Sequence, residues 1–235
     1  MNKLYYDLHI HSCLSPCGDD DMTPANIVGM AVVNNLDVIA ITDHNTCRNC
    51  GPAIEMAKEY GIIVIPGMEL CTSEEVHILC LFSNLENAMK FSDYVYSQLI
   101  KVKNNEEIFG KQEVYNNMDE IIDHEPYLLI NASNISFNQV DLLVKEYNGI
   151  MIPAHIDKNS NSVFSNLGFI PPESKFNTIE FASKEKIEEF YHQHKGLDKY
   201  NVIINSDAHY LENINKRTNY IECDSRDKEE ILRKL

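Results

Sequence analysis

The chain has 235 residues, of which 44% are apolar and 24% are charged, as in an ordinary globular protein. Its formal charge of −16 at pH 7 argues against binding of duplex DNA, because neutralising phosphates requires a basic surface. No apolar run reaches the length of about 18 residues that a membrane span needs, and the first residues do not resemble a signal peptide. We therefore expect a cytoplasmic protein that contacts no membrane and keeps its seven cysteines reduced.

Short apolar runs that alternate with amphipathic segments predict an α/β fold. The apolar runs are Leu4–His9, Asp37–Thr42, Ile62–Pro66, Val76–Phe82, Ile150–Ala154, Thr178–Ala182 and Val202–Ser206. Helices are predicted over Thr23–Asn34, Pro52–Tyr60, Phe137–Tyr147 and Lys184–His194. Strands separated by helices indicate a parallel sheet with helices outside it, and seven such strands are close to a closed barrel.

The segment from about residue 85 to residue 149 does not follow this alternation of apolar runs and amphipathic segments. A helix is predicted over Glu86–Asn104, followed by a polar stretch and a short apolar piece at Tyr127–Ile130. We interpret residues 85–149 as an elaboration within a single domain of residues 1–235, not as a second domain. The tail predicts one more strand at Thr218–Cys223 and a short charged helix.

Side chains that bind metals follow the predicted strands. His9 and His11 alternate with Ile10 on one strand, so both imidazoles point to the same face. Four later strands lead into further ligand types, namely His44, Glu69, His155, and the pair Asp207 and His209. Because the carboxyl ends of barrel strands converge on one mouth, we expect these side chains to meet there. His77 opens its strand instead of closing it, so strand position alone includes it only provisionally.

These segments together resemble the PHP (polymerase and histidinol phosphatase) superfamily, and they occur in that family's order. They are Asp7-Leu-His9-Ile-His11-Ser12, Thr42-Asp43-His44-Asn45, Pro66-Gly67-Met68-Glu69, His77, Pro153-Ala154-His155 and Ser206-Asp207-Ala208-His209. The resemblance implies a distorted seven-stranded (β/α)7 TIM-like barrel, usually with three metals. Members of the family include histidinol phosphatases, nucleotide phosphoesterases, and editing or vestigial domains of bacterial polymerases.

The resemblance also implies a ligand set. It places the first metal on His9, His11, Glu69 and Asp207, the second on His44, His209 and a loop residue, and the third on Glu69, His77 and His155. The loop ligand is ambiguous, because many relatives have Ser-Asp-Gly shortly before Thr-Pro, and this chain has three extra residues there. Counting back from Thr23 selects Asp19, with Asp20 and Asp21 as open alternatives.

Such ligands suit two to three divalent ions of zinc, manganese or iron. Adjacent cations lower the pKa of a bridging water from about 15.7 towards about 7. We therefore predict an enzyme that hydrolyses a small phosphate ester with metal-activated hydroxide, with Asp207 and His209 as catalytic residues. Arg48, Lys158 and Arg217 lie close to ligands in sequence and are candidates for binding the phosphate, although a solvated surface role fits each equally well.

Other functions stay open. A nuclease on short nucleic acid ends, or a nucleotide 3′-phosphate hydrolase, would use the same centre. A C–N hydrolase of the amidohydrolase type also begins with His-x-His, but Glu69 and the Asp-x-His ending argue against it. A degenerate PHP module with a structural or partner-binding role is the non-enzymatic alternative. Cys47 and Cys50, with Cys13 and Cys17, could instead form a thiol metal site or a redox pair. Neither the natural substrate nor the oligomeric state can be read from the sequence.

Overall fold

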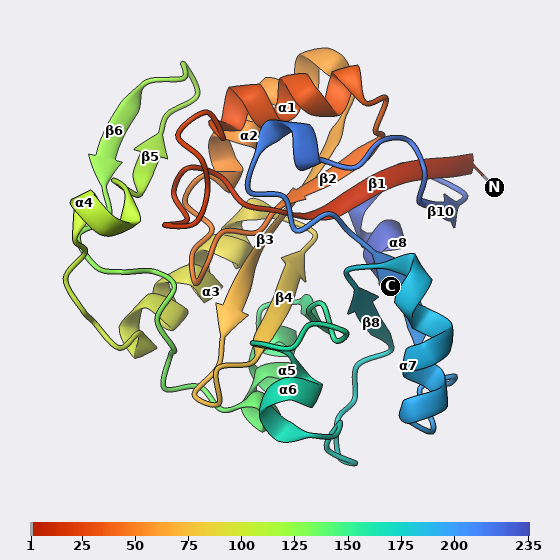
Figure 1. Ribbon diagram of the computed structural model, residues 1–235. Coiled ribbons are helices and arrows are strands. Elements are labelled where there is room, and N and C mark those ends of the chain that lie inside the picture. Colours follow the sequence, from red (N-terminus) through yellow and green to blue (C-terminus); the bar gives the residue numbers. More distant parts are fainter. Residues whose placement is uncertain (1) are drawn as a thin grey trace.

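The computed structural model describes residues 2–235, and six of its strands form one curled sheet (Figure 1). The strand order is β10 (Tyr220–Cys223), β1 (Asn2–Ile10), β2 (Val38–Ile41), β3 (Ile63–Cys71), β4 (His77–Phe82) and β7 (Gly149–Pro153). Strands β1, β2 and β3 are parallel, whereas β4 is antiparallel to both β3 and β7, and β10 is antiparallel to β1. The mixed α/β class predicted from sequence is confirmed, but the purely parallel sheet is not.

The reversal of β4 has a local cause. Only the turn over residues 72–76 separates β3 from β4, and a connection this short permits an antiparallel hairpin but no parallel crossover. Glu75 occupies the left-handed region in this turn, with a φ of 59°. The amino end of β4 therefore lies beside the carboxyl ends of β1, β2 and β3.

Strands β8 (Thr178–Phe181) and β9 (Asn201–Ile204) form a separate parallel pair that continues the curve. The amide of Ile156 donates to Glu180 O at 2.9 Å after β7, and a single bridge joins Ile10 of β1 to Ala208 after β9. All seven predicted strands are thus present, but continuous pairing joins only five of them, with β10 as the sixth strand of the sheet. A closed seven-stranded barrel stays a prediction.

The helices lie around the sheet. They are α1 (Pro24–Val33), α2 (Cys50–Ala57), α3 (Leu85–Gln98), α4 (Glu106–Phe109), α5 (Phe137–Glu146), α6 (Val163–Leu167), α7 (Ile187–Gln193) and α8 (Lys228–Arg233), with 3-10 turns η1 (Lys58–Tyr60), η2 (Lys184–Lys186) and η3 (Leu211–Asn213). Thr23 caps α1 by accepting from Asn26 N, and Pro24 is its first residue, as the sequence indicates. No helix within residues 2–235 is long and apolar enough to cross a membrane.

The segment 85–149 departs most from the predicted pattern. Helix α3 ends at Gln98, short of the predicted Asn104, because Ile100 N donates to Ala132 O and the chain becomes extended there. A hairpin of β5 (Glu113–Tyr115) and β6 (Ile121–His124) then projects at the edge of the molecule (Figure 1). Tyr115 N donates to the Asn49 side chain at 3.0 Å, which ties the hairpin to the loop that follows β2.

Alternation along the strands builds two apolar layers. Leu8, Ala40, Leu79 and Ile152, each 0% exposed, belong to one cluster of strand residues that also contains residues of α8. The residues between them, such as Ile39 and Ile78, belong to the cluster that includes helices α1, α2, α3 and α5. The interior is therefore mainly apolar, and most of its buried histidines lie towards one end of the strands.

Candidate metal centre

The carboxylate of Glu69, in β3, is the middle of a buried cluster. Its side chain is 1% exposed, and imidazole nitrogens approach both of its oxygens. The nitrogen-to-oxygen distances are 2.9 Å to His77, 3.0 Å to His155, 3.1 Å to His44, 3.3 Å to His9 and 3.4 Å to His11. One carboxylate thus faces five imidazoles, as a group shared between cations would.

Asp207 closes the other side of this cluster. Its Oδ1 lies 3.2 Å from the Nε2 atoms of both His9 and His11, and these two nitrogens are 3.2 Å from each other. The ring of His209 stacks on that of His11 with centroids 4.5 Å apart. The backbone of Asp207 has a φ of 52°, in the left-handed region that a non-glycine residue rarely adopts.

The topology explains how these residues meet. Most of them lie at or just beyond the carboxyl ends of β1, β2, β3, β7 and β9, as predicted. His77 joins them because β4 runs backwards and so begins where the other strands end. The structure therefore brings eight of the nine predicted ligands together, namely His9, His11, His44, Glu69, His77, His155, Asp207 and His209.

Burial and mutual charge shift these groups. Burial would raise the pKa of Glu69, but His77, His9 and His44 hold it well below its usual value. Burial lowers the pKa of His77, and the Glu69 carboxylate more than reverses this and raises it to about 10. Burial and the neighbouring His11 lower the pKa of His209 to about 4. The opposite shifts of Glu69 and His77 follow from their contact at 2.9 Å.

The donor set fits divalent cations. Imidazole and carboxylate are ligands of zinc, manganese and iron. The Nδ1 atoms of His44 and His155 are buried and have no hydrogen-bond partner within residues 2–235, although His44 Nδ1 lies 3.1 Å from a Glu69 oxygen. A buried polar atom without a hydrogen bond is costly. Three groups of side chains have donor atoms within 4.8 Å of one another: His9, His11 and Glu69; His44, Glu69 and His77; and His11, Cys17, His44 and His209.

Outer carboxylates orient the inner imidazoles. Glu180 of β8, buried, lies 3.1 Å from His9 Nδ1, accepts from His155 N at 2.8 Å, and accepts from the Asn205 side chain at 2.6 Å. Fixing one ring nitrogen directs the other towards the cluster. Sequence reasoning missed Glu180, although a lone carboxylate within an apolar strand run was a usable signal.

Asp43 plays a similar part for His11. It accepts from Ser12 N, Ser12 Oγ and Ser15 Oγ, each at 2.7 Å. Ser15 Oγ in turn lies 3.0 Å from His11 Nδ1 and accepts from His44 N at 3.1 Å. The start of the loop after β1 is thereby tied to two of the predicted ligands.

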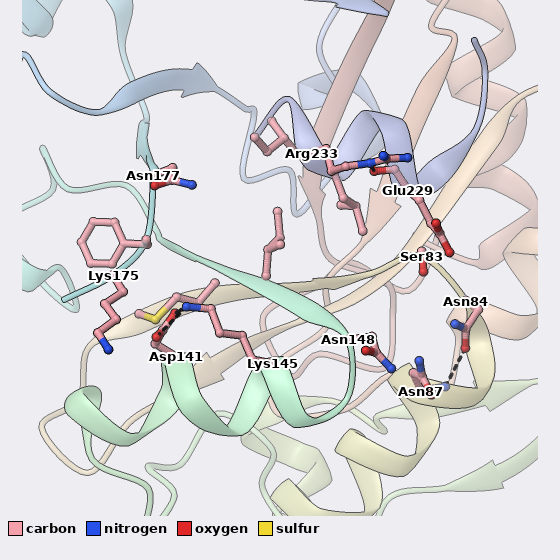
Figure 2. A pocket seen from close by; sticks show the side chains of 15 residues that line it. Ser83, Asn84, Asn87, Asp141, Lys145, Asn148, Lys175, Asn177, Glu229 and Arg233 are labelled. Carbon is pink, nitrogen blue, oxygen red and sulfur yellow. Dashed lines mark hydrogen bonds and ion pairs between the residues drawn. The ribbon is translucent and has the colours of Figure 1, made fainter.

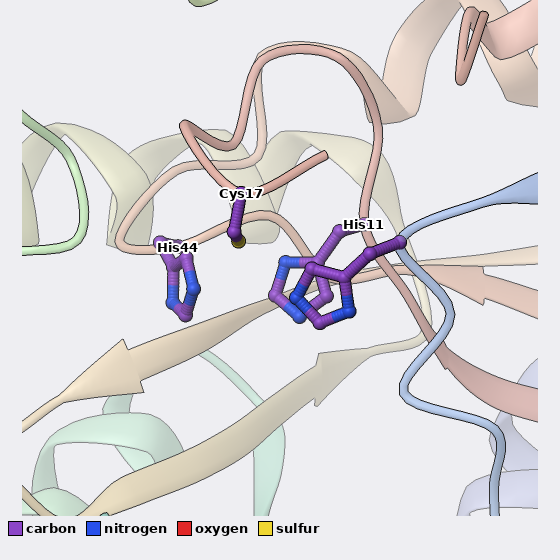
Figure 3. Close-up of side chains that lie close together, drawn as sticks. His11, Cys17 and His44 are labelled. Atoms are coloured by element: carbon purple, nitrogen blue, oxygen red, sulfur yellow. The ribbon is translucent and has the colours of Figure 1, made fainter. Parts of the chain in front are cut away.

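The predicted loop ligand lies elsewhere. The Asp19 carboxylate accepts from Asp21 N at 3.0 Å, and Asp20 and Asp21 are exposed. None of the three belongs to the groups of converging donors found within residues 2–235. Cys17 reaches the cluster instead, and Figure 3 shows it beside His11 and His44. Burial, reinforced by Glu69 and Asp207, raises the pKa of the Cys17 thiol.

The three basic candidates for phosphate binding lie in different places. Lys158 pairs with Asp207 and lines a cavity of about 180 Å³ that also contains Glu69 and His209. Arg48 pairs with Asp123 of β6 at 2.5 Å, outside this cavity. Arg217 donates to Asn35 O and lies over the Tyr5 ring, near the opposite end of β1. Only Lys158 is positioned at the cluster.

The Cys-x-x-Cys pair belongs to the core. Cys47 and Cys50 are fully buried, and the Cys50 thiol donates to Ile41 O and Gly67 O, both at 3.4 Å. Within residues 2–235 the seven cysteines are free, and no group of converging metal donors contains Cys13, Cys47 or Cys50. These observations favour a packing role for the pair over a thiol metal site.

A larger cavity of about 540 Å³ lies at the other end of the strands (Figure 2). It is lined by residues that follow β4 or precede β7 and β8, such as Asn84, Asn148 and Asn177. Its lining contains no histidine or cysteine, and Asp141 there already pairs with Lys145. The larger cavity therefore lacks the imidazoles that gather at the opposite end of the strands.

A curled α/β sheet with imidazoles and carboxylates at one mouth is the arrangement that the resemblance implies for PHP proteins. The chain belongs to the PHP domain family, whose model matches residues 7–161. Asp207 and His209 lie beyond the matched part, yet they join the same cluster.

Individual proteins are similar to the chain in sequence or in fold. The 5′-3′ exoribonuclease Rnm of Escherichia coli is 38% identical over 81 residues, which are 32% of this chain and 27% of that protein. The lesion-specific endonuclease Q of Pyrococcus furiosus has a TM-score of 0.68 at 19% identity, covering 99% of this chain and 55% of that one. A Bifidobacterium adolescentis protein described as a metal-dependent phosphoesterase has a TM-score of 0.58 at 19% identity, with 88% of both chains covered. The chain spans half or less of the length of the first curated relatives it matches.

Proposed function

We propose that the chain is a metal-dependent phosphoesterase that hydrolyses a small phosphate ester at a centre of two or three divalent cations. The observation that carries this proposal is the position of Glu69, whose two oxygens lie 2.9–3.4 Å from the nitrogens of five imidazoles. When bound, such cations supply Lewis acidity towards phosphoryl oxygens and make a coordinated water more acidic. Zinc, manganese and iron all match the donor set.

The chain's own residues would bind the cations and the phosphate group of the substrate. His9, His11, His44, Glu69, His77, His155, Asp207 and His209 would hold the cations. Lys158, at the cavity rim with a side chain that is 40% exposed, would bind a phosphate oxygen of the substrate. His209 is the most exposed imidazole of the cluster, at 27%, and its low pKa keeps it neutral at pH 7. Together with Asp207 it would act next to the reacting phosphate.

Two features favour a small ester. The cavity beside the cluster has a volume of about 180 Å³, which suits a phosphate with a modest substituent. The formal charge of −16 opposes a long polyanion on the surrounding surface. A nuclease acting on short ends is the second candidate, supported by the exoribonuclease relative. The structure of endonuclease Q with an abasic duplex also makes duplex DNA a substrate to be tested.

The test combines elemental metal analysis with turnover of p-nitrophenyl phosphate, bis-p-nitrophenyl phosphate, a 5′-phosphorylated short RNA and an abasic duplex. The wild-type chain, His209→Ala and the control His192→Ala are compared, because His192 is an exposed residue of α7 outside the cluster. Monoester turnover that is lost only in His209→Ala supports the proposal. Preference for the RNA or the duplex would replace it with a nuclease, and bound metal without any turnover would favour a degenerate module.

A further inference from the structure

The loop between β1 and α1 presents a thiol to the cluster. Cys17 Sγ and one nitrogen from each of His11, His44 and His209 lie within 4.8 Å of one another. Figure 3 shows the sulfur pointing into the space between His11 and His44. Zinc lies about 2.1 Å from nitrogen and about 2.3 Å from sulfur in a tetrahedral site, so its nitrogen and sulfur donors are about 3.6 Å apart. Side-chain movements of about 1 Å or less would therefore bring these donors onto one cation.

The backbone of this loop fixes the direction of Cys17. Ser15 N donates to Ser12 O at 3.0 Å, and Gly18 N donates to Ser15 O at 2.9 Å. A Cβ on Gly18 would lie 2.2 Å from Ser12 O, so the close turn requires glycine after Cys17. Asp19 N donates to His209 O at 3.0 Å, which ties the loop to one of the imidazoles facing the sulfur.

The carboxylates that compete with Cys17 are directed elsewhere. Asp19 accepts from Asp21 N in a local turn, while Asp20 and Asp21 are exposed. Cys17 is half-buried and lines the same cavity as His44, Glu69 and His209. The loop therefore offers sulfur, not oxygen, to the neighbouring imidazoles.

We propose that Cys17 is the loop ligand, so that one cation of the centre is held by a thiolate together with His44 and His209. This proposal rests on the metal centre of the proposed function, but not on the identity of its substrate. As the metal–sulfur bond forms, the S–H bond breaks and its proton passes to solvent. A thiolate favours zinc or ferrous iron over manganese and magnesium, so it narrows the choice of metal.

The test is spectroscopic. The metal-free full chain is reconstituted with Co²⁺, and the expected result is a thiolate-to-cobalt charge-transfer band in the near ultraviolet. The band should be lost in Cys17→Asp, whose carboxylate still binds cobalt, and kept in Cys13→Ala. Cys13 is the matched control because it is buried in the same loop but belongs to no group of converging donors within residues 2–235. X-ray absorption of the zinc form should show one sulfur at about 2.3 Å.

Other outcomes would overturn the proposal. Cobalt bound without the band, or a band that persists in Cys17→Asp, would remove Cys17 from the centre. The loop ligand would be the Asp19 carboxylate if two results were found together. These are loss of one metal equivalent in Asp19→Asn, and a cobalt spectrum of Cys17→Asp that is the same as that of the wild-type chain. A chain that binds no metal would contradict both proposals, whereas a thiolate band without phosphoester turnover supports Cys17 and contradicts only the proposed activity.

Discussion

Both carboxylate oxygens of Glu180 lie 3.1 Å from Nδ1 of His9 in a pair that is almost completely buried. A carboxylate accepts but does not donate, so the ring must carry its proton on Nδ1. Nε2 of His9 faces Glu69 and Asp207, and a bound cation would take the place of the proton on this nitrogen. One residue outside the cluster thus selects the tautomer that a metal ligand needs.

Replacing this outer carboxylate should weaken metal binding without abolishing it. We expect Glu180→Gln to lower metal affinity by about 10- to 100-fold, as is typical for partners of metal-bound histidine. Competition with a chromogenic chelator measures the change. Glu188→Gln, on the exposed face of α7, is the control, and equal affinities of the two variants would show that Glu180 does not orient His9.

Metal removal should destabilise the chain. A ligand present at 1,000 times its Kd stabilises the native state by about 4 kcal/mol, which in a chain of this size is about 10 °C in Tm. We expect a chelator to lower Tm by about that amount and added zinc to restore it, as followed by calorimetry. An unchanged Tm in a chain shown to have lost its metal would mean that the cluster is equally stable without cations.

The metal-free form should lose stability as pH rises. His77 has a pKa of about 10 in the folded chain against an ordinary value of 6.5. The ion pair with Glu69 therefore contributes fully below pH 6.5, and its contribution is lost between pH 6.5 and pH 10. His9, whose pKa is also raised, acts in the same direction. Urea unfolding of the chelated chain across this window measures the effect, and His77→Gln should flatten the curve.

The glycine of the β1–α1 loop should resist substitution. Because an added Cβ would meet Ser12 O at 2.2 Å, Gly18→Ala should cost about 1–3 kcal/mol of unfolding free energy and displace Cys17. Gly29→Ala in α1 is the contrasting variant, since nothing lies within 4 Å of its Cβ position. It should stabilise the helix by about 0.5–1 kcal/mol. Chemical denaturation of both variants tests the pair, and equal effects would exclude a steric cause.

Lys158 should matter for substrate more than for folding. Its removal deletes a charged hydrogen bond to phosphate, worth about 1.5–3 kcal/mol, so Lys158→Ala should raise KM for a phosphomonoester about tenfold or more. Steady-state kinetics of Lys158→Ala is compared with that of Arg217→Ala. Arg217→Ala is the control, because Arg217 lies near the opposite end of β1. If Arg217→Ala raised KM equally, the cavity beside Asp207 would not be the phosphate site.

The sequence predicts most of the strands and eight of the side chains that cluster in the structure, because both depend on local pattern. A strand run followed by His44 or His155 is readable without knowing the partner strands. The direction of β4 is not readable in this way, since it follows from the shortness of the turn before His77. Glu180 escaped notice because its role depends on a contact with His9, 171 residues away.

The loop after β1 shows a different limit of sequence reasoning. Counting from Thr23 assumes that extra residues leave the spacing to the helix unchanged. In the structure the loop is anchored by its first residues, through Ser12 and Ser15 to Asp43. The side chain directed at the imidazoles is therefore Cys17, closer to β1 than the counted position.

The β3–β4 hairpin fixes the number of residues between Glu69 and His77. Glu69 and His77 are eight residues apart, and the register pairs Cys71 with His77. Slipping β4 by one residue would turn His77 outward and present Ile78 to the cavity. The spacing between Glu69 and His77 is therefore fixed by the register of the two strands. An eight-residue spacing between the glutamate and the histidine could therefore be used to recognise intact centres in other sequences.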